Sequence, residues 1–375
     1  MNRYVGIDKT ELRNIEVCKI NIDRLQSDDV IATFTESELG YLVQDTEGNY
    51  HRLERIKVKP QPQQVFSEFR VDYEIKNGVR EYYVKLVLTI PREGRDSNLV
   101  PMPVWEYKNY LESIRSYLAS TYGIYIDMSE ARLYMVELNI TSQMRYPLHD
   151  YRLIFEGAMI KRNQKKYRFF RMTGEGDRKF MSYELFSTKT KKEQRSLNIL
   201  KIYDKTEQLA NCFKIYEDNQ YMRMEYVFTT YKMIESRLGT SYIADLTDDI
   251  VRDFLSENIQ EDIFKPVEAY INDSNKQLKK IYTDIKKKHK RGYIRQFAQY
   301  SSQKEVQILD MEQVVAIAKK DMSKSNHFKL NYKIVDEVMP NILKNNYDKL
   351  AELKDRGGRS WSMRFAEFSG FGRSG

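Results

Sequence analysis

Cysteine, tryptophan and proline are scarce in this sequence. Its 375 residues contain two cysteines, two tryptophans and eight prolines. Cys18 and Cys212 lie far apart without CxxC spacing or a histidine cluster, which argues against a structural zinc site and fits a reducing compartment. No run of 18 apolar residues occurs, so no membrane-spanning helix and no membrane partner are expected. Residues 1–14 hold no apolar stretch of the kind that a secretory signal needs, so we expect a cytoplasmic protein.

Positive charge is in moderate excess. The sequence has 62 lysines and arginines against 54 acidic residues, giving a net charge of +8 and a sequence pI of about 9.0. A basic surplus favours a polyanionic partner, of which nucleic acid is the usual one. Tyrosine is abundant, with 28 copies, so composition cannot single out one tyrosine as functional.

Alternating apolar and polar residues indicate β-strands through much of the first 238 residues. Residues 65–75 and 80–90 flank Asn77-Gly78, a pair that suits a type I′ hairpin turn. Helical spacing over 104–124 predicts a helix that ends at Gly123. Other strands are expected at 16–22, 30–35, 131–142, 151–160, 166–172, 180–187, 197–203 and 221–229, with a short helix at 205–218.

The pattern becomes helical from about residue 231 onward. We therefore predict an α+β fold in which an antiparallel-sheet, nuclease-like catalytic region at 1–238 precedes an all-helical, basic DNA-binding region at 239–355. The remaining residues, 356–375, are rich in glycine, serine and arginine and are expected to form a flexible tail.

Three of the predicted strands carry a polar face opposite an apolar one. On strand 131–142, Tyr134 and Val136 are expected on the apolar core face and Glu137 on the polar face. If the three strands are neighbours in one sheet, six polar side chains converge: Glu137, Lys201, Tyr203, Lys205, Arg223 and Glu225. An ordinary solvated face of an antiparallel sheet would show the same alternation, so periodicity alone leaves that interpretation open.

The converging residue types suit phosphoryl transfer. Two carboxylates, Glu137 and Glu225, can hold a hard divalent ion that polarises a phosphoryl oxygen. Lysine and arginine side chains can hold the developing phosphate charge. Attack by the hydroxyl of Tyr203 on DNA would leave a phosphotyrosyl link and a free hydroxyl.

Four stretches occur in an order that resembles a known family. They are YYVKLVLTIP at 82–91, MVELNIT at 135–141, ILKIYDKTEQ at 199–208 and YMRMEYVF at 221–228. In this succession the chain resembles the replication initiators of filamentous phages, of the gene II type, and the related trans-acting plasmid initiators. The resemblance covers roughly residues 65–260, and its specificity lies in the succession because each motif is short.

The resemblance implies an enzyme that nicks and rejoins one DNA strand at an origin, which starts rolling-circle replication. It implies Tyr203 as the nucleophile, assisted by Lys205, with Mg or Mn held by Glu137 and Glu225. Lys201 and Arg223 would bind the DNA phosphate. The expected partner is the origin of a plasmid, phage or mobile element, and a host helicase and a second copy of the chain are further candidate partners.

The sequence departs from the family pattern near the first acid. Glu137 stands where aspartate is more usual, and Met135 stands where an arginine is expected. The His-hydrophobe-His metal motif of many rolling-circle nucleases is also missing, so the metal has to be coordinated mainly by carboxylates. Tyr183 is the alternative nucleophile, although a packed strand residue is the plainer interpretation of it.

A run of basic residues lies within 275–296. Its cations, predicted to contact DNA phosphates, are Lys286, Lys287, Lys288, Lys290 and Arg291. A solvated helix face is the competing interpretation of such a run.

Three other functions remain open on the sequence alone. A relaxase of a conjugative element would use the same chemistry on different DNA. A non-catalytic DNA-binding regulatory protein would bind without a metal or a covalent product. An interaction protein with a merely solvated basic face would show no salt-dependent affinity for DNA.

Overall fold

The computed structural model describes residues 3–60, 66–89, 99–151, 155, 171–173, 180–186, 199–266, 269, 348–349 and 351–352. The chain divides into two compact units. The first consists of Met1–Gln143 and Thr173–Leu255, and the second of Met144–Met172 and Ser256–Gly375. The boundary expected at residue 238 therefore falls inside the first unit.

The described strands form one large, mainly antiparallel sheet. Its order is β10-β11-β12-β13-β9-β1-β7-β6-β5-β4-β2-β8, with β3 paired to β5, and β2 pairs with β4 in parallel. The strands are β1 (Arg3–Arg13), β2 (Glu16–Ile20), β3 (Val30–Phe34), β4 (Tyr41–Asp45), β5 (Tyr50–Val58), β6 (Glu68–Lys76), β7 (Val79–Thr89), β8 (Ile124–Asp127), β9 (Arg132–Met144), β10 (Arg171–Thr173), β11 (Phe180–Phe186), β12 (Ile199–Asp204) and β13 (Gln220–Phe228).

The described helices are few and mostly short. They are α1 (Val104–Tyr122), α3 (Lys205–Gln208), α4 (Tyr231–Leu238) and α5 (Asp248–Ile259), with 3-10 turns at Ile22–Gln26 and Leu148–Tyr151 and π-helical turns at Leu209–Phe213 and Gln260–Phe264. None of the helices described here combines the length and apolar character that a membrane crossing requires. The large antiparallel-dominated sheet is as predicted. The all-helical second region stays a prediction, because most of 239–355 lies outside the described residues.

The predicted hairpin and its turn are confirmed. β6 and β7 pair in register up to Lys76 opposite Val79. Between them, Asn77 and Gly78 both have positive φ, 51° and 82°. A two-residue turn with both central residues in this region matches the right-handed twist of the flanking strands, which is why Asn-Gly selects it.

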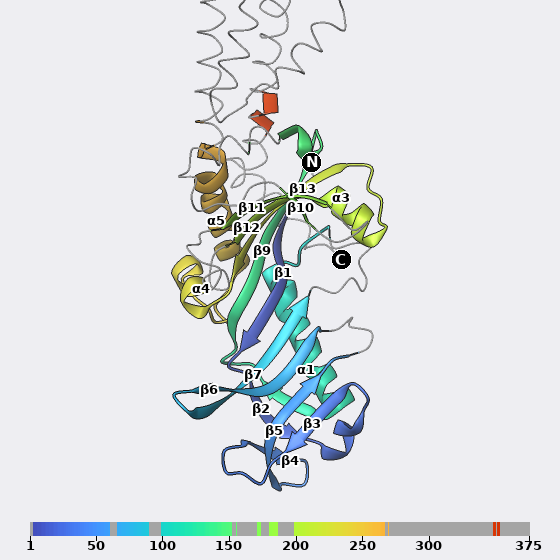
Figure 1. The fold of residues 1–375 in the computed structure, drawn as a ribbon, viewed down its shortest axis with the longest axis vertical. Coiled ribbons are helices and arrows are strands. Elements are labelled where there is room, and N and C mark those ends of the chain that lie inside the picture. Colours follow the sequence, from blue (N-terminus) through green and yellow to red (C-terminus); the bar gives the residue numbers. More distant parts are fainter. Residues whose placement is uncertain are drawn as a thin grey trace, which may run out of the picture. The chain divides into compact units, whose positions relative to one another are not determined.

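Helix α1 packs on one face of the sheet, behind β7 and β1 in Figure 1. Its residue Tyr107 is buried, and its hydroxyl lies 2.6 Å from the Thr10 hydroxyl of β1. The helix ends at Gly123, whose φ of 65° favours glycine. The buried strand residues of this face include Ile7, Leu12, Phe69, Leu86, Val136 and Leu138.

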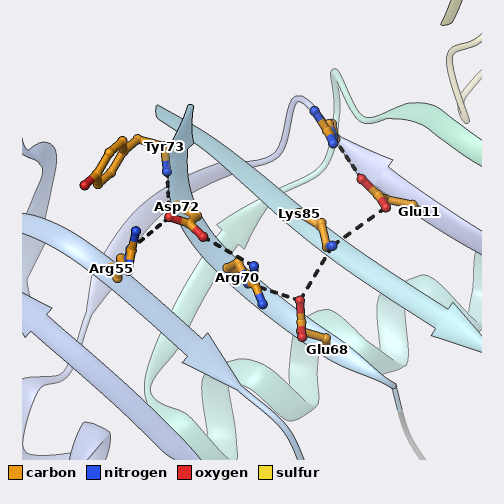
Figure 2. A network of polar contacts seen from close by, with 8 residues as sticks. Glu11, Arg55, Glu68, Arg70, Asp72, Tyr73 and Lys85 are labelled. Atoms are coloured by element: carbon orange, nitrogen blue, oxygen red, sulfur yellow. Dashed lines mark hydrogen bonds and ion pairs between the residues drawn. The ribbon is translucent and has the colours of Figure 1, made fainter. Parts of the chain in front are cut away.

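The opposite side, here called the polar face, carries alternating charges over β1, β7, β6 and β5 (Figure 2). The ion pairs run from Glu11 to Lys85 (3.8 Å), Lys85 to Glu68 (3.6 Å), Glu68 to Arg70 (3.1 Å), Arg70 to Asp72 (3.3 Å) and Asp72 to Arg55 (3.0 Å). Separate exposed ion pairs contribute little to stability, but a linked series fixes the position of each side chain.

Two one-residue register shifts interrupt the pairing of β1 with β9. One leaves Asp8 between the pairs Ile7–Leu138 and Lys9–Glu137, and the other leaves Tyr134 between Met135 and Leu133. An extra residue of this kind redirects side chains at that point. The prediction that Tyr134 lies on the apolar face is therefore wrong: it is half-buried and stacks with Arg13 instead.

The strand expected at 151–160 is also wrong where the residues are described. Tyr151 ends a 3-10 turn and Phe155 is helical. The reason lies within the second unit, where the Asp150 amide donates to the carbonyl of Pro147 and closes a turn. The hydroxyl of Tyr151 also donates to Glu352 at 2.5 Å. The short helix expected at 205–218 forms but ends at Phe213, because Lys214 adopts a φ of 59°.

Candidate metal and tyrosine site

Three neighbouring strands bring the predicted polar residues onto one face. The sheet order places β12, β13 and β9 side by side. Lys201 lies opposite Glu225, and Tyr203 lies opposite Arg223. Directly opposed residues of an antiparallel pair point to the same face. The three strands are therefore neighbours, which is the condition under which the sequence predicts that these side chains converge.

Three carboxylates meet on this face. One oxygen each of Asp8, Glu137 and Glu225 lies within 4.8 Å of the other two. The three residues come from β1, β9 and β13, so residues more than 200 positions apart form one cluster. We call these residues the carboxylate cluster.

Asp8 is the member that the sequence reasoning missed. It comes from VGIDKTE in β1, a strand that the sequence analysis did not single out. The register shift at Asp8 separates it from regular pairing, next to the pair of Lys9 with Glu137. An aspartate within an alternating strand could have been noticed in the sequence. The register shift that directs it toward Glu137 cannot be predicted from the periodicity of β1.

The carboxylate cluster fits a hard divalent cation. Oxygens spaced within 4.8 Å of one another all lie within about 2.8 Å of a common point, close to the metal–oxygen distances of Mg²⁺ and Ca²⁺ sites. Three negative groups held this close otherwise repel one another, which favours either a bound cation or a bound proton.

Glu137 holds a proton in the metal-free cluster. Burial, followed by the charge of Glu225, raises the pKa of Glu137 to about 8. Burial alone would raise the pKa of Glu225 as well, but the charge of Lys201 and a hydrogen bond with Glu137 outweigh it and lower that pKa. At neutral pH the pair therefore carries one shared proton, with Glu225 as the ionised partner.

Arg223 holds one member of the cluster in place. Its side chain is fully buried, and its Nη1 donates to Asp8 at 3.0 Å. The other donors reach the Thr141 hydroxyl at 2.8 Å and the carbonyl oxygen of Leu99 at 2.9 Å. These bonds occupy the guanidinium with protein partners, so its position fixes Asp8 more directly than it offers a charge to a phosphate.

Tyr203 lies beside the cluster but is 4% exposed. Its ring is 5.4 Å from that of Phe180, and the residue lies directly opposite Arg223 across the strand pair. Burial, followed by the charge of Glu225, raises the pKa of Tyr203 well above its ordinary value, against the opposing effect of Arg223. The phenol is therefore neutral in the free protein.

The two predicted lysines occupy different environments. Lys201 is partly exposed, and its ammonium is 3.7 Å from a carboxylate oxygen of Glu225. Lys205 is fully buried at the start of α3, where it donates to Gln208 at 2.7 Å. Its ammonium lies 5.9 Å from the centre of the Tyr203 ring. Lys201 is thus the more accessible lysine of the pair.

Tyr183, the alternative nucleophile, does not join this site. Tyr183 is opposite Ile202 rather than Tyr203, so its buried side chain points to the other face of the sheet. The basic residues Lys286, Lys287, Lys288, Lys290 and Arg291 lie outside the described residues.

No protein-family model matches the sequence, and no curated protein matches it. Among solved structures, a rolling circle replication initiator protein from Geobacillus stearothermophilus is similar at 10% identity and a TM-score of 0.33, over 69% of this chain and 85% of that chain. The di-domain ARO/CYC BexL from the BE-7585A biosynthetic pathway gives 10% identity and a TM-score of 0.17, over 69% and 96%. CalU16 from Micromonospora echinospora gives 11% and 0.13, over 36% and 83%. TM-scores this low do not establish a shared fold.

Proposed function

We propose that this protein is a metal-dependent DNA nicking and joining enzyme that initiates rolling-circle replication. The observation that carries the proposal is the convergence of Asp8, Glu137 and Glu225 on the same face as Tyr203. Metal-ligating carboxylates beside a hydroxyl nucleophile and a lysine are the groups that phosphoryl transfer needs. The ordered succession of sequence motifs around these residues supports the same activity.

The carboxylate cluster would hold Mg or Mn, which would polarise a phosphoryl oxygen of the bound DNA. Lys201, at the exposed side of Glu225, neutralises charge on the phosphate. Arg223 keeps Asp8 in place through its hydrogen bond. Lys205 lies near the tyrosine ring, where its positive charge favours a phenolate over a phenol.

In the proposed step, the Tyr203 oxygen attacks the phosphorus atom of one DNA phosphate. The phosphorus bond to one neighbouring sugar oxygen breaks, which leaves a phosphotyrosyl link and a free hydroxyl. The phenol proton passes to a carboxylate of the cluster, and the departing sugar oxygen takes up a proton from water. Attack by the free hydroxyl on the phosphotyrosyl link reverses these changes and rejoins the strand. A relaxase of a conjugative element would perform the same step on different DNA.

The burial of Tyr203 favours a second candidate function. A tyrosine that is 4% exposed and neutral is also what a sheet residue without a chemical role looks like. In that case the protein is a non-catalytic DNA-binding regulatory protein. It would bind DNA in salt-sensitive fashion without a metal and form no covalent product.

The test uses supercoiled plasmid carrying the gene of this protein with its flanking DNA. The full-length protein is incubated with the plasmid and Mg or Mn, and a protein–DNA adduct is sought on denaturing gels. We expect an adduct with the wild type and with Tyr183→Phe, and none with Tyr203→Phe or in EDTA. Nicking by Tyr203→Phe would reject the nucleophile. Salt-sensitive binding without any adduct would favour the regulatory protein.

A further inference from the structure

Tyrosine rings and guanidinium groups stack in a continuous series on the polar face, at one end of β9. The Arg13 guanidinium lies 3.5 Å from the centre of the Tyr134 ring and 4.8 Å from that of Tyr83. The Tyr134 and Tyr231 rings meet edge to face at 5.3 Å. The Arg132 guanidinium lies 4.6 Å from Tyr231 and 4.8 Å from Tyr242. We call this series the stacking ladder; its members are Tyr83, Arg13, Tyr134, Tyr231, Arg132 and Tyr242.

The ladder lies on the same side of the sheet as the carboxylate cluster. Leu12 and Leu133 are opposite each other and fully buried on the α1 side. Their neighbours Arg13 and Arg132 therefore point to the polar face. The register shift places Tyr134 there as well, and Tyr83 is opposite Asp72 of the polar face.

Acidic partners hold both guanidinium groups in place. Arg13 donates to Glu11 at 2.9 Å, and Glu11 belongs to the ion-pair series of Figure 2. Arg132 pairs with Glu235 and donates to the Ser241 hydroxyl at 2.8 Å. The arginine charges are thus largely neutralised within the protein, while all six side chains of the ladder stay partly exposed. The ladder therefore presents a ligand mainly with planar surfaces for stacking and with little net positive charge.

The ladder and the carboxylate cluster are joined by one strand. Tyr134 lies three residues before Glu137 on β9, a separation of about 10 Å along the strand. A nucleic acid strand whose phosphate reaches the cluster would place its neighbouring nucleotides over the ladder.

We propose that the stacking ladder binds the unpaired bases of single-stranded nucleic acid next to the carboxylate cluster. Unpaired bases present π-faces to aromatic and guanidinium planes, whereas paired bases hide them inside the duplex. Because Arg13 and Arg132 already have acidic partners, the ladder adds little phosphate affinity and distinguishes single strands from duplex. The placement of the reacting phosphate rests on the proposed function, but the binding itself does not.

The test measures fluorescence anisotropy with a short labelled single strand of mixed sequence and with its duplex, in EDTA. Tyr134→Leu and Tyr83→Leu remove a ring but keep apolar bulk, and each is expected to raise the single-strand Kd by about five- to hundredfold. Tyr134→Phe keeps the ring and should bind as the wild type does. The duplex Kd should change little in every variant.

Tyr73→Leu is the matched control. Tyr73 also lies beside arginines, Arg80 at 4.6 Å and Arg55 at 5.2 Å, but it is opposite Tyr82 and is not a member of the stacking ladder. Its single-strand Kd should equal that of the wild type. Unchanged single-strand Kd values in Tyr134→Leu and Tyr83→Leu, with unchanged melting temperatures, would overturn the inference. The ladder would then have no role in binding.

The same proteins separate this inference from the proposed function. Tyr203→Phe should lose the covalent adduct yet keep the single-strand Kd. Ladder-dependent binding without any adduct would reject the enzyme and retain the ladder. An adduct that forms in all ladder variants, with unchanged single-strand binding, would retain the enzyme and reject the binding role of the ladder.

Discussion

Glu137 and Glu225 share one proton inside a largely buried site, and this makes the site sensitive to pH. Glu137 has a pKa of about 8 in the folded protein and of about 4.3 in the unfolded chain. Its contribution to stability is complete below pH 4.3 and is lost as the pH rises through about 8. Glu225, with a lowered pKa, is ionised in both states over this window and does not offset the loss.

We therefore predict that the metal-free protein melts at a lower temperature at pH 8 than at pH 5. In Glu137→Gln, the uncharged amide cannot ionise, so this part of the pH dependence should disappear. Calorimetry in EDTA across the window measures both proteins. Equal slopes for the two would show that Glu137 is ionised in the folded protein at neutral pH. Addition of Mn at pH 8 should raise the melting temperature of the wild type more than that of the variant, because the metal binds ionised carboxylates.

Among the secondary-structure elements, β1 lies close to the segment before α1, and this contact fixes the position of the strand that carries Asp8. The amide of Ile7 donates to the carbonyl of Met102 at 2.8 Å. A Cβ at Gly6 would lie 2.3 Å from that carbonyl oxygen, which belongs to the backbone and cannot rotate away. Only glycine fits this position without moving the strand that carries Asp8.

Gly6→Ala is predicted to destabilise the protein by about 1–3 kcal/mol and to weaken Mn binding, because β1 has to shift. The control is Gly78→Ala at the hairpin turn, where a Cβ meets nothing within 4 Å but φ is +82°. That change should cost about 1–2 kcal/mol through backbone strain and leave Mn affinity unchanged. Urea denaturation and Mn titration distinguish the two, and equal Mn affinities would show that β1 does not position Asp8.

Elements with strong local sequence signals are predictable from the sequence, whereas features set by irregular strand pairing are not. Asn77-Gly78 and Gly123 mark a turn and a helix end because only certain residues adopt those φ values. Periodicity likewise placed Glu137 and Glu225 on one polar face. Asp8 and Tyr134 escaped because each sits at a register shift, which is set by the partner strand and not by local sequence.

The whole chain carries a net charge of +8, and the salt dependence of DNA binding tests the proposed role of the basic run within 275–296. Changing the predicted phosphate-binding residues Lys286, Lys287, Lys288, Lys290 and Arg291 together to glutamine should weaken duplex binding. The slope of log K against log salt should fall by about 0.9 for each DNA phosphate that the variant no longer neutralises. Lys214→Gln with Lys265→Gln, at exposed described positions, is the control. An unchanged slope in the fivefold variant would show that the basic run is only solvated.

The proposed enzyme forms a covalent bond between Tyr203 and DNA, which mass spectrometry can detect on the tyrosine itself. The full-length protein is reacted with origin-bearing DNA and Mn, the DNA is digested with nuclease, and the modified peptide is sequenced. We predict a nucleotide on Tyr203, within ILKIYDKTEQ. A nucleotide on Tyr183 or on any other residue would contradict it.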